Sequence, residues 1–261
     1  MEIRKNCSAL EVRDLAIGYD GRMVLENLNF TVQPGEIFAV MGASGCGKST
    51  LLKNIIGIYQ PLHGSIKIFG QESSSVDPIQ PGDIARLFGV TYQGGALLGS
   101  LTLAENVALV LEEHTQLSKA EINERVQQKL ALVGLAEFSS FLPNEISGGM
   151  KKRAGLARAL AMDPPLLFFD EPSAGLDPVS SAELDKLILE MRDKLNCTVV
   201  IVSHELDSIY SIADRAVLLD KTTRTIAAVG DPRELRDTCT TPWIKDFLTR
   251  KGMTGIKTAQ I

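Results

Sequence analysis

A glycine-rich run between residues 42 and 50 has the residue types that hold phosphate groups. It matches the pattern G-x-x-x-x-G-K-[ST], in which backbone N–H groups curl around phosphate oxygens. Lys48 is expected to reach the β- and γ-phosphates, and the Ser49 hydroxyl to ligate Mg²⁺. The run therefore predicts a site for a nucleoside triphosphate and Mg²⁺, whose nucleotide contacts are Gly42, Ala43, Ser44, Gly45, Cys46, Gly47, Lys48, Ser49 and Thr50.

The residues on both sides of this run supply the context that the motif needs. Residues 37–41 form an unbroken apolar run, which is typical of a strand buried in a parallel sheet. After the motif, apolar residues recur at helical spacing, at Leu51, Leu52, Ile55 and Ile56. The loop therefore precedes a helix N-terminus, whose dipole favours a bound anion. These flanks argue against the alternative, an ordinary glycine-rich turn that matches by chance.

Two carboxylates follow a second apolar run, residues 166–169, which predicts another buried strand. The carboxyl edge of a parallel sheet faces the ligand, so Asp170 and Glu171 are expected beside the triphosphate. Neighbouring strand residues point in opposite directions, and the two acids must therefore do different jobs. We expect Asp170 to hold the Mg²⁺ shell and Glu171 to orient and deprotonate the attacking water. Two acids that merely end a strand are the alternative.

Two further polar residues also follow strand-like runs. His204 comes after the apolar residues 199–202, and we expect it to contact the γ-phosphate. Gln93 comes after residues 90–92 and is a candidate Mg²⁺ ligand that also orients the water. An ordinary surface or core histidine and an ordinary loop amide are the alternatives. The predicted catalytic set is thus Glu171, His204 and Gln93, and the predicted Mg²⁺ set is Ser49, Gln93 and Asp170.

A second candidate anion site begins with Ser147, Gly148 and Gly149 at the start of a basic helix. Its free N–H groups, hydroxyl and positive helix end are suited to phosphate. The loop at residues 42–50 already serves the chain's own nucleotide, so a second phosphate-binding helix makes sense if it contacts the nucleotide of another copy. These three residues therefore predict a head-to-tail dimer with two composite sites.

Composition narrows the possible partners and location. The net charge of −5 argues against nucleic acid as the main partner, because phosphate contacts need clustered Lys and Arg. The four cysteines are far apart, which favours a reducing compartment over a metal site or disulfide framework. The first six residues lack the apolar core of a signal peptide, and no apolar run approaches the ~18 residues of a membrane span. A membrane protein partner would have to hold the chain at a membrane.

The remaining patterns predict an α/β fold with a β-rich N-terminal part and a helical segment at about residues 93–162. Capping boxes place two helix starts near residues 103 and 119. The other expected elements are strands at 198–202, 216–219 and 225–229, a helix opened by Ser180 and Glu183, a final helix begun at 231–232, a loop at 71–83 and a loose tail at 252–261.

The order of the motifs resembles the ATPase subunits of ABC transporters: Tyr19, G-A-S-G-C-G-K-S-T, Gln93, I-S-G-G-M, L-L-F-F-D-E, S-A-G-L-D and His204. The similarity covers about residues 8–235, and residues 236–261 are left as a C-terminal helix and tail. It implies a P-loop NTPase fold of the ABC nucleotide-binding type with a helical subdomain at about 93–162. It also implies that ATP is the nucleotide, that Tyr19 stacks on the adenine, and that residues 174–177 couple the two sites of a dimer.

The sequence departs from the usual motifs of the family at two places, and these departures narrow the resemblance to one group within the family. Ile146 and Met150 replace the ends of the signature L-S-G-G-Q, and the loop after Gln93 lacks the proline common in solute importers. The segments Y-Q-G-G-A-L-L-G-S-L-T and S-G-G-M-K-K-R are similar to the MCE-associated lipid transporters of Gram-negative bacteria, the Mla or toluene-tolerance type. This implies phospholipid transport between inner and outer membranes with an integral membrane permease and a periplasmic MCE-domain protein, and a position on the cytoplasmic side of the inner membrane.

Three alternatives stay open at this point. The ATPase could serve a transporter for another solute, such as an amino acid or a drug, because every catalytic residue would be the same. An ABC protein of DNA repair or translation usually has two cassettes or long coiled-coil arms, and neither pattern occurs here. A catalytically inactive cassette would have lost Lys48, Glu171 or His204, and all three are present.

Overall fold

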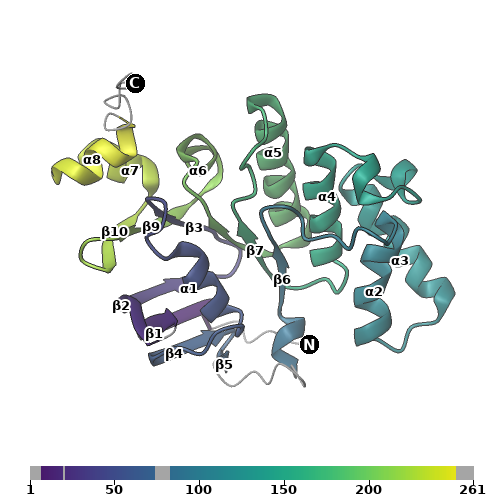
Figure 1. Cartoon of the computed structure of the whole chain (residues 1–261), viewed down its shortest axis with the longest axis horizontal. Coiled ribbons are helices and arrows are strands. Elements are labelled where there is room, and N and C mark those ends of the chain that lie inside the picture. Colours follow the sequence, from purple (N-terminus) through teal and green to yellow (C-terminus); the bar gives the residue numbers. More distant parts are fainter. Residues whose placement is uncertain (1–6, 20, 74–82, 251–261) are drawn as a thin grey trace, which may run out of the picture.

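A computed structural model describes residues 7–19, 21–73 and 83–250. Its centre is a six-stranded sheet (Figure 1) whose strand order is β10-β9-β3-β8-β7-β6. All neighbours in it are parallel except the pair β9 and β10. The strands are β3 (Ile37–Gly42), β6 (Phe88–Thr91), β7 (Leu166–Asp170), β8 (Thr198–Val202), β9 (Arg215–Asp220) and β10 (Thr225–Gly230).

The register of this sheet brings the ends of its central strands to one edge. Asp170, the last residue of β7, pairs with Val202, the last residue of β8. Val202 in turn pairs with Val40, two residues before the end of β3. The loops that begin after Gly42, Asp170 and Val202 therefore start side by side, as ligand-binding loops of parallel sheets do. The strands expected at 37–41, 166–169 and 198–202 are confirmed.

A smaller antiparallel sheet has the order β2-β1-β4-β5. Its strands are β1 (Leu10–Tyr19), β2 (Arg22–Val32), β4 (His63–Ile68) and β5 (Gln71–Glu72). Together with α1 (Lys48–Ile55) it packs on one face of the central sheet, burying residues such as Phe38, Val40 and Leu51. The loop expected at 71–83 needs a correction, because Gln71 and Glu72 pair with β4 and Asp83–Arg86 forms the 3-10 helix η1. The rest of that loop, residues 74–82, lies outside the described residues.

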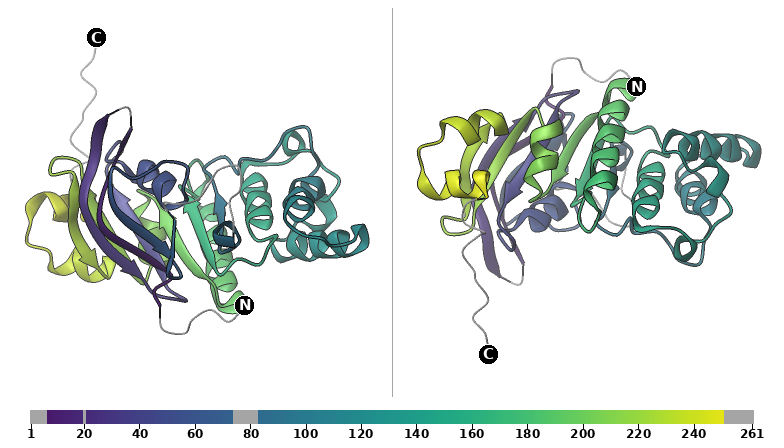
Figure 2. Two further views of the ribbon diagram at one scale, coloured as in Figure 1. Left: turned by 90° about the horizontal axis from the view of Figure 1, so that it is seen from below. Right: turned by 90° about the horizontal axis from the view of Figure 1, so that it is seen from above.

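Three α-helices form a lobe at one end of the molecule (Figure 2): α2 (Leu103–His114), α3 (Lys119–Leu132) and α4 (Gly148–Ala159). Short 3-10 helices η2 (Ala136–Phe138) and η3 (Pro143–Glu145) connect α3 to α4. Both predicted capping boxes are present, so α2 and α3 begin at the expected residues. The lobe falls within the predicted helical segment, whose domain bounds stay a prediction.

Helix α5 (Pro178–Leu195) begins earlier than expected. The sequence pattern pointed to Ser180 as the start, but the carboxylate of Asp177 accepts hydrogen bonds from the N–H groups of Val179 and Ser180, both 3.0 Å away. Asp177 is therefore the N-cap, and Pro178 takes the first helical position, where its missing N–H costs nothing. Helix α5 and the short α6 (Leu206–Ile212) pack on the other face of the central sheet.

Up to residue 250, where the described part of the chain ends, the C-terminal part contains two helices where the sequence suggested one. Helix α7 (Pro232–Thr238) lies across the boundary placed between residues 235 and 236, and α8 (Pro242–Thr249) follows it. Pro242 disfavours helical backbone at the residue before it and then starts the new helix. Residues 1–6 and the predicted tail, 252–261, lie outside the described residues. Among the helices that the structure describes, none is long and apolar enough to span a membrane.

Candidate nucleotide-binding site

The loop between β3 and α1 has a backbone that depends on glycine. Gly47, the N-cap of α1, has a φ of 105°, in the left-handed region. A Cβ at this position would lie 2.7 Å from the side chain of Val24. A side chain there would therefore strain the backbone and clash with β2. The sequence needs glycine at this position to bring the loop N–H groups to the start of the helix.

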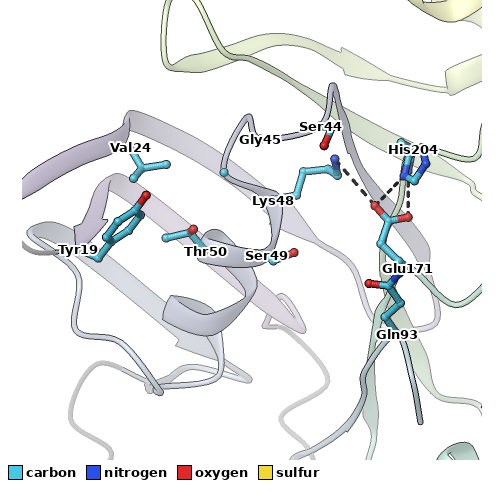
Figure 3. Close-up of a pocket in the computed structure, with 11 residues that line it drawn as sticks. Tyr19, Val24, Ser44, Gly45, Lys48, Ser49, Thr50, Gln93, Glu171 and His204 are labelled. Atoms are coloured by element: carbon cyan, nitrogen blue, oxygen red, sulfur yellow. Dashed lines mark hydrogen bonds and ion pairs between the residues drawn. The ribbon is translucent and has the colours of Figure 1, made fainter. Parts of the chain in front are cut away.

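Lys48 is the first residue of α1, directly after the loop, and only 7% of it is exposed. Its Nζ donates hydrogen bonds to the carbonyl oxygens of Gly42, at 2.8 Å, and Ala43, at 3.3 Å. Glu171 Oε1 lies 3.9 Å from the same nitrogen (Figure 3). The loop carbonyls and one carboxylate thus hold the ammonium group in place on the strand side of the pocket, where a phosphate could compete for it.

Glu171 is fixed by the end of β8. Its Oε1 lies 2.8 Å from Nδ1 of His204, while its Oε2 accepts hydrogen bonds from the Ser203 hydroxyl, at 3.2 Å, and the His204 N–H, at 3.4 Å. Its own N–H donates to the carbonyl of Val202 at 2.8 Å. These contacts account for the low exposure of its side chain, 14%.

Contrary to the prediction from the sequence pattern, Asp170 and Glu171 do not alternate along one strand. Strand β7 ends at Asp170, and Glu171 has a φ of 49°, which is left-handed backbone. A turn, not strand alternation, therefore directs the two carboxylates to different partners. Left-handed backbone in a residue other than glycine is uncommon and clusters at functional sites.

The structure brings two of the three predicted Mg²⁺ ligands together. The Ser49 hydroxyl donates to Oδ1 of Asp170 at 3.3 Å. Burial raises the pKa of Asp170 above its usual range, the Ser49 hydrogen bond lowers it, and the nearby Glu171 raises it again. A hydroxyl and a carboxylate in contact with each other are oxygen donors of the kind Mg²⁺ prefers, so the residues fit this ion. Gln93, the third, lines the adjoining pocket.

These groups surround a cavity of about 420 Å³, within the usual size range of ligand sites. It is lined by Tyr19, Val24, Ser44, Gly45, Gly47, Lys48, Ser49, Thr50, Gln93, Glu171 and His204 (Figure 3). Tyr19 is 53% exposed, so its ring is free for a base to stack on it. The predicted contacts Gly42, Ala43 and Cys46 are not part of this lining: Gly42 and Cys46 are buried, whereas Ala43 is exposed. Val24, an apolar wall of the cavity, was missed because an isolated valine in a strand carries no chemical signal.

Ser147, Gly148 and Gly149 are not part of this cavity. Ser147 is the N-cap of α4, and its Oγ accepts a hydrogen bond from the Met150 N–H at 3.3 Å. Ser147 and Gly149 line a separate cavity of about 230 Å³ between the starts of α4 and α5. The predicted second anion site therefore lies apart from the chain's own phosphate-binding loop at residues 42–50, the P-loop. Its action on the nucleotide of another copy stays a prediction.

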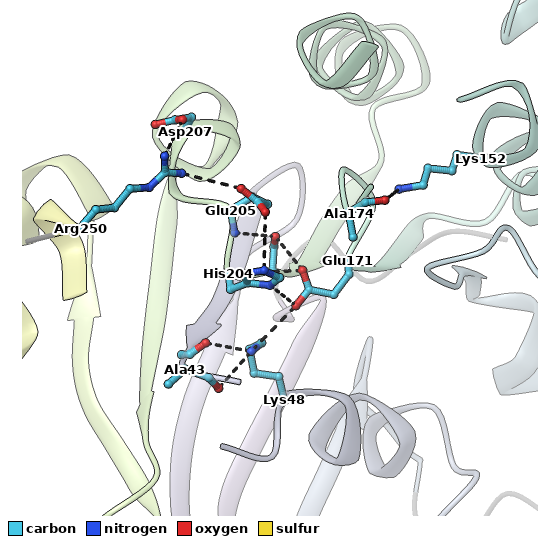
Figure 4. Close-up of polar contacts among 11 residues, drawn as sticks. Ala43, Lys48, Lys152, Glu171, Ala174, His204, Glu205, Asp207 and Arg250 are labelled. Carbon is cyan, nitrogen blue, oxygen red and sulfur yellow. Dashed lines mark hydrogen bonds and ion pairs between the residues drawn. The ribbon is translucent and has the colours of Figure 1, made fainter. Parts of the chain in front are cut away.

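Sequence reasoning missed two groups on α4 that connect it to the site. Lys152 Nζ donates to the carbonyls of Pro172 and Ala174, each at 2.5 Å, and so holds the loop that begins with Glu171. Figure 4 shows the contact with Ala174. Arg158 donates to the carbonyl of Ala96 at 2.6 Å, three residues after Gln93. The sequence pattern showed only a basic helix, because the charges along one helix do not reveal which distant carbonyls its side chains will contact.

The sequence pattern of the ABC transporter family matches residues 25–174. This is more than half of the chain, and the chain therefore belongs to the ABC transporter family. The predicted family, the fold of an ABC ATPase cassette, and Mg²⁺-dependent ATP hydrolysis as the activity of that class are confirmed. The roles of individual site residues stay predictions.

Two relatives and one solved structure sharpen this assignment. The "Intermembrane phospholipid transport system ATP-binding protein MlaF" of Haemophilus influenzae is 40% identical over 214 residues, covering 82% of this chain and 81% of that protein. The "Probable ribonucleotide transport ATP-binding protein mkl" of Mycobacterium tuberculosis is 40% identical over 240 residues. That match covers 92% of this chain, which spans 66% of the mkl protein's length.

The solved structure is a dimer of the ATP-binding cassette MJ0796 in a post-hydrolysis state, bound to ADP and Pi. It matches this chain with a TM-score of 0.76 and 27% identity, covering 85% of this chain and 98% of that chain. A cassette with this fold thus holds the products of ATP hydrolysis as a dimer.

Proposed function

We propose that this chain is the ATP-hydrolysing subunit of an ABC transporter that moves phospholipid between the inner and outer membranes. The observation that carries the lipid assignment is the 40% identity to MlaF over most of both chains. Two segments support the same substrate: the loop after Gln93 and the segment S-G-G-M-K-K-R. Their sequences are similar to those of MCE-associated transporters.

The cavity supports a division of labour in hydrolysis. Lys48 and the loop N–H groups bind the β- and γ-phosphates, and Tyr19 stacks on the adenine. Ser49, Asp170 and Gln93 hold Mg²⁺, which supplies positive charge to the phosphate oxygens when bound. Glu171 accepts a proton from the attacking water, and His204, which contacts its carboxylate at 2.8 Å, orients it and contacts the γ-phosphate.

The proposed assembly is a head-to-tail dimer held on the cytoplasmic side of the inner membrane by an integral permease. The position of Ser147–Gly149 outside the chain's own cavity supports a composite site, because those residues are left available to a second copy. A periplasmic MCE-domain protein completes the proposed transporter. The net charge of −5 gives no support to a nucleic-acid partner.

A second substrate class is suggested by the name of the mkl proteins, which refers to ribonucleotide transport. Their match covers more of this chain than the MlaF match does, 92% against 82%. The matched region, however, makes up 81% of the length of MlaF but only 66% of the length of mkl. We therefore favour phospholipid and treat a polar solute as the competing outcome of the test.

The test is purification of the tagged full-length chain from native membranes, followed by transfer of a labelled phospholipid between vesicles. We expect a permease and an MCE-domain protein to co-purify, and transfer to require ATP. The matched control is Glu171→Gln, which leaves the outer surface unchanged and should keep both partners while losing transfer. A solute-binding protein in place of the MCE-domain protein, or transfer that proceeds equally without ATP, would overturn the phospholipid assignment.

A further inference from the structure

The end of helix α8 reaches the catalytic edge of the sheet from the far end of the sequence. Ile244 and Leu248 bury one side of α8 in the core, with exposed fractions of 4% and 1%. The Tyr210 hydroxyl of α6 donates to the Leu248 carbonyl at 2.6 Å. This docking places Arg250, the C-cap of α8, beside the start of α6, whose N-cap Glu205 directly follows His204.

Arg250 continues a line of charged contacts that ends at the P-loop lysine (Figure 4). Its guanidinium lies 3.0 Å from Asp207 Oδ2 and 3.8 Å from Glu205 Oε2. The other oxygen of Glu205 lies 3.6 Å from Nε2 of His204. The opposite ring nitrogen, Nδ1, lies 2.8 Å from Glu171. His204 is thus placed between two carboxylates, and Arg250 contacts the outer one.

We propose that Arg250 is a positioning residue for the His204–Glu171 pair and acts through Glu205; this rests on the proposed role of that pair in ATP hydrolysis. Two carboxylates compete for one imidazole, which is 44% exposed. Arg250 draws Glu205 outward and compensates its negative charge, so the ring stays with Glu171. Without Arg250, the charge of Glu205 attracts the ring and disturbs the contact that orients the catalytic carboxylate.

The size of this effect is limited by solvent. Arg250 and Glu205 are 45% and 42% exposed, and ion pairs at such exposure are weak. The expected loss in kcat for Arg250→Ala is therefore about three- to fivefold, the rate equivalent of one exposed ion pair. KM for ATP should stay within about twofold, because the P-loop contacts of the nucleotide are unchanged. Arg250→Lys should restore most of the rate, since the charge is kept.

The decisive experiment is a double-mutant cycle on the full-length chain, measured as steady-state ATP hydrolysis. In a Glu205→Gln background the charge that Arg250 compensates is gone. Adding Arg250→Ala there should change kcat by less than about 1.5-fold, against three- to fivefold in the wild-type background. Glu205 makes no side-chain capping bond to α6, so the substitution leaves that helix start intact.

Tyr210→Phe is the matched control, because it removes another anchor of α8 and keeps Arg250. It should lower the melting temperature slightly and leave kcat unchanged. If it reproduces the Arg250→Ala loss, or if Arg250→Ala costs the same in both backgrounds, Arg250 acts only by docking α8 and the proposal is overturned.

The cycle also separates this inference from the proposed function. A wild-type chain that hydrolyses ATP but moves no phospholipid contradicts the transport function. The double-mutant cycle can still be interpreted in that case, because it is measured by ATP hydrolysis alone. A transporting wild type whose cycle shows no coupling overturns only the role of Arg250, whereas absence of wild-type hydrolysis would overturn both.

Discussion

The P-loop and the start of α4 are both suited to bind phosphate, yet the chain surrounds them differently. Around Lys48, side chains from three other loops converge, and Glu171 and His204 already contact each other at 2.8 Å. At the start of α4, the Ser147 hydroxyl accepts a hydrogen bond from its own helix, and the residues that line the adjacent cavity include none of Lys48, Glu171 and His204. The proposed catalytic groups thus lie around one loop and not around the other. This is the arrangement expected if the two loops are unlike halves of a site that a second copy completes, as proposed above.

The largest expected effect tests Glu171, the proposed general base beside the P-loop. Glu171→Gln should keep ATP binding, because Lys48 and the P-loop are untouched, but lower turnover by roughly 10²–10⁴-fold, the usual contribution of a general base. Steady-state ATP hydrolysis and equilibrium nucleotide binding measure the two quantities separately. Unchanged turnover would mean that another group is the base, and that the Glu171–His204 contact is structural.

A substitution at the other loop tests the half-site interpretation. Ser147→Arg places a bulky side chain where a second copy's nucleotide would lie, so hydrolysis should fall by about 10²-fold, comparable to removal of a preorganised donor. Binding of ATP to the monomer should stay within about twofold, because Ser147 lies outside the P-loop cavity. Ser147→Thr, which keeps the hydroxyl and the N-cap, is the control and should remain active.

Mixing variants distinguishes a composite site from simple misfolding. A dimer of one Ser147→Arg chain and one Lys48→Ala chain retains a single intact site, whereas each variant alone has none. Equal mixing should therefore restore up to about a quarter of the wild-type rate, since half of the dimers are mixed and each has one site of two. No recovery, combined with wild-type melting temperatures of both variants, would contradict the head-to-tail arrangement.

The two loops also differ in how far the sequence alone could predict them. The P-loop, the strand that precedes it and both capping boxes are local patterns within a few residues, and the structure has them where expected. The conformation of Glu171 could not be predicted in this way, because its left-handed backbone depends on a hydrogen bond to Val202, 31 positions later. The contacts of Lys152 and Arg250 likewise join segments that only the fold brings together. Pro242, by contrast, was a visible signal that a second C-terminal helix begins.

A further prediction concerns Lys152, which connects helix α4 to the loop that begins with Glu171. Burial lowers the pKa of Lys152, whose ammonium group holds the carbonyls of Pro172 and Ala174 beside Glu171. Lys152→Met leaves these partly buried carbonyls without a donor, at about 1–3 kcal/mol each. We expect a lower melting temperature and a roughly tenfold fall in kcat with little change in ATP binding. The neighbouring Lys151→Met makes the same charge change and is the control; an equal loss there would remove the special role of Lys152.

The smallest expected effect concerns Cys46, and it tests whether the thiol is reactive or only packs within the P-loop. Cys46 is 2% exposed, and burial raises the pKa of its thiol, an effect that the nearby Lys48 only partly opposes. A raised pKa means less thiolate at neutral pH, so alkylation should be slow there and accelerate as the pH rises toward that pKa. ATP should slow it further by covering the loop, and Cys46→Ser should change kcat by less than about twofold. Mass spectrometry of alkylated peptides measures the rate. Rapid modification at pH 7 that abolishes hydrolysis would show instead that the loop opens in solution and exposes this thiol.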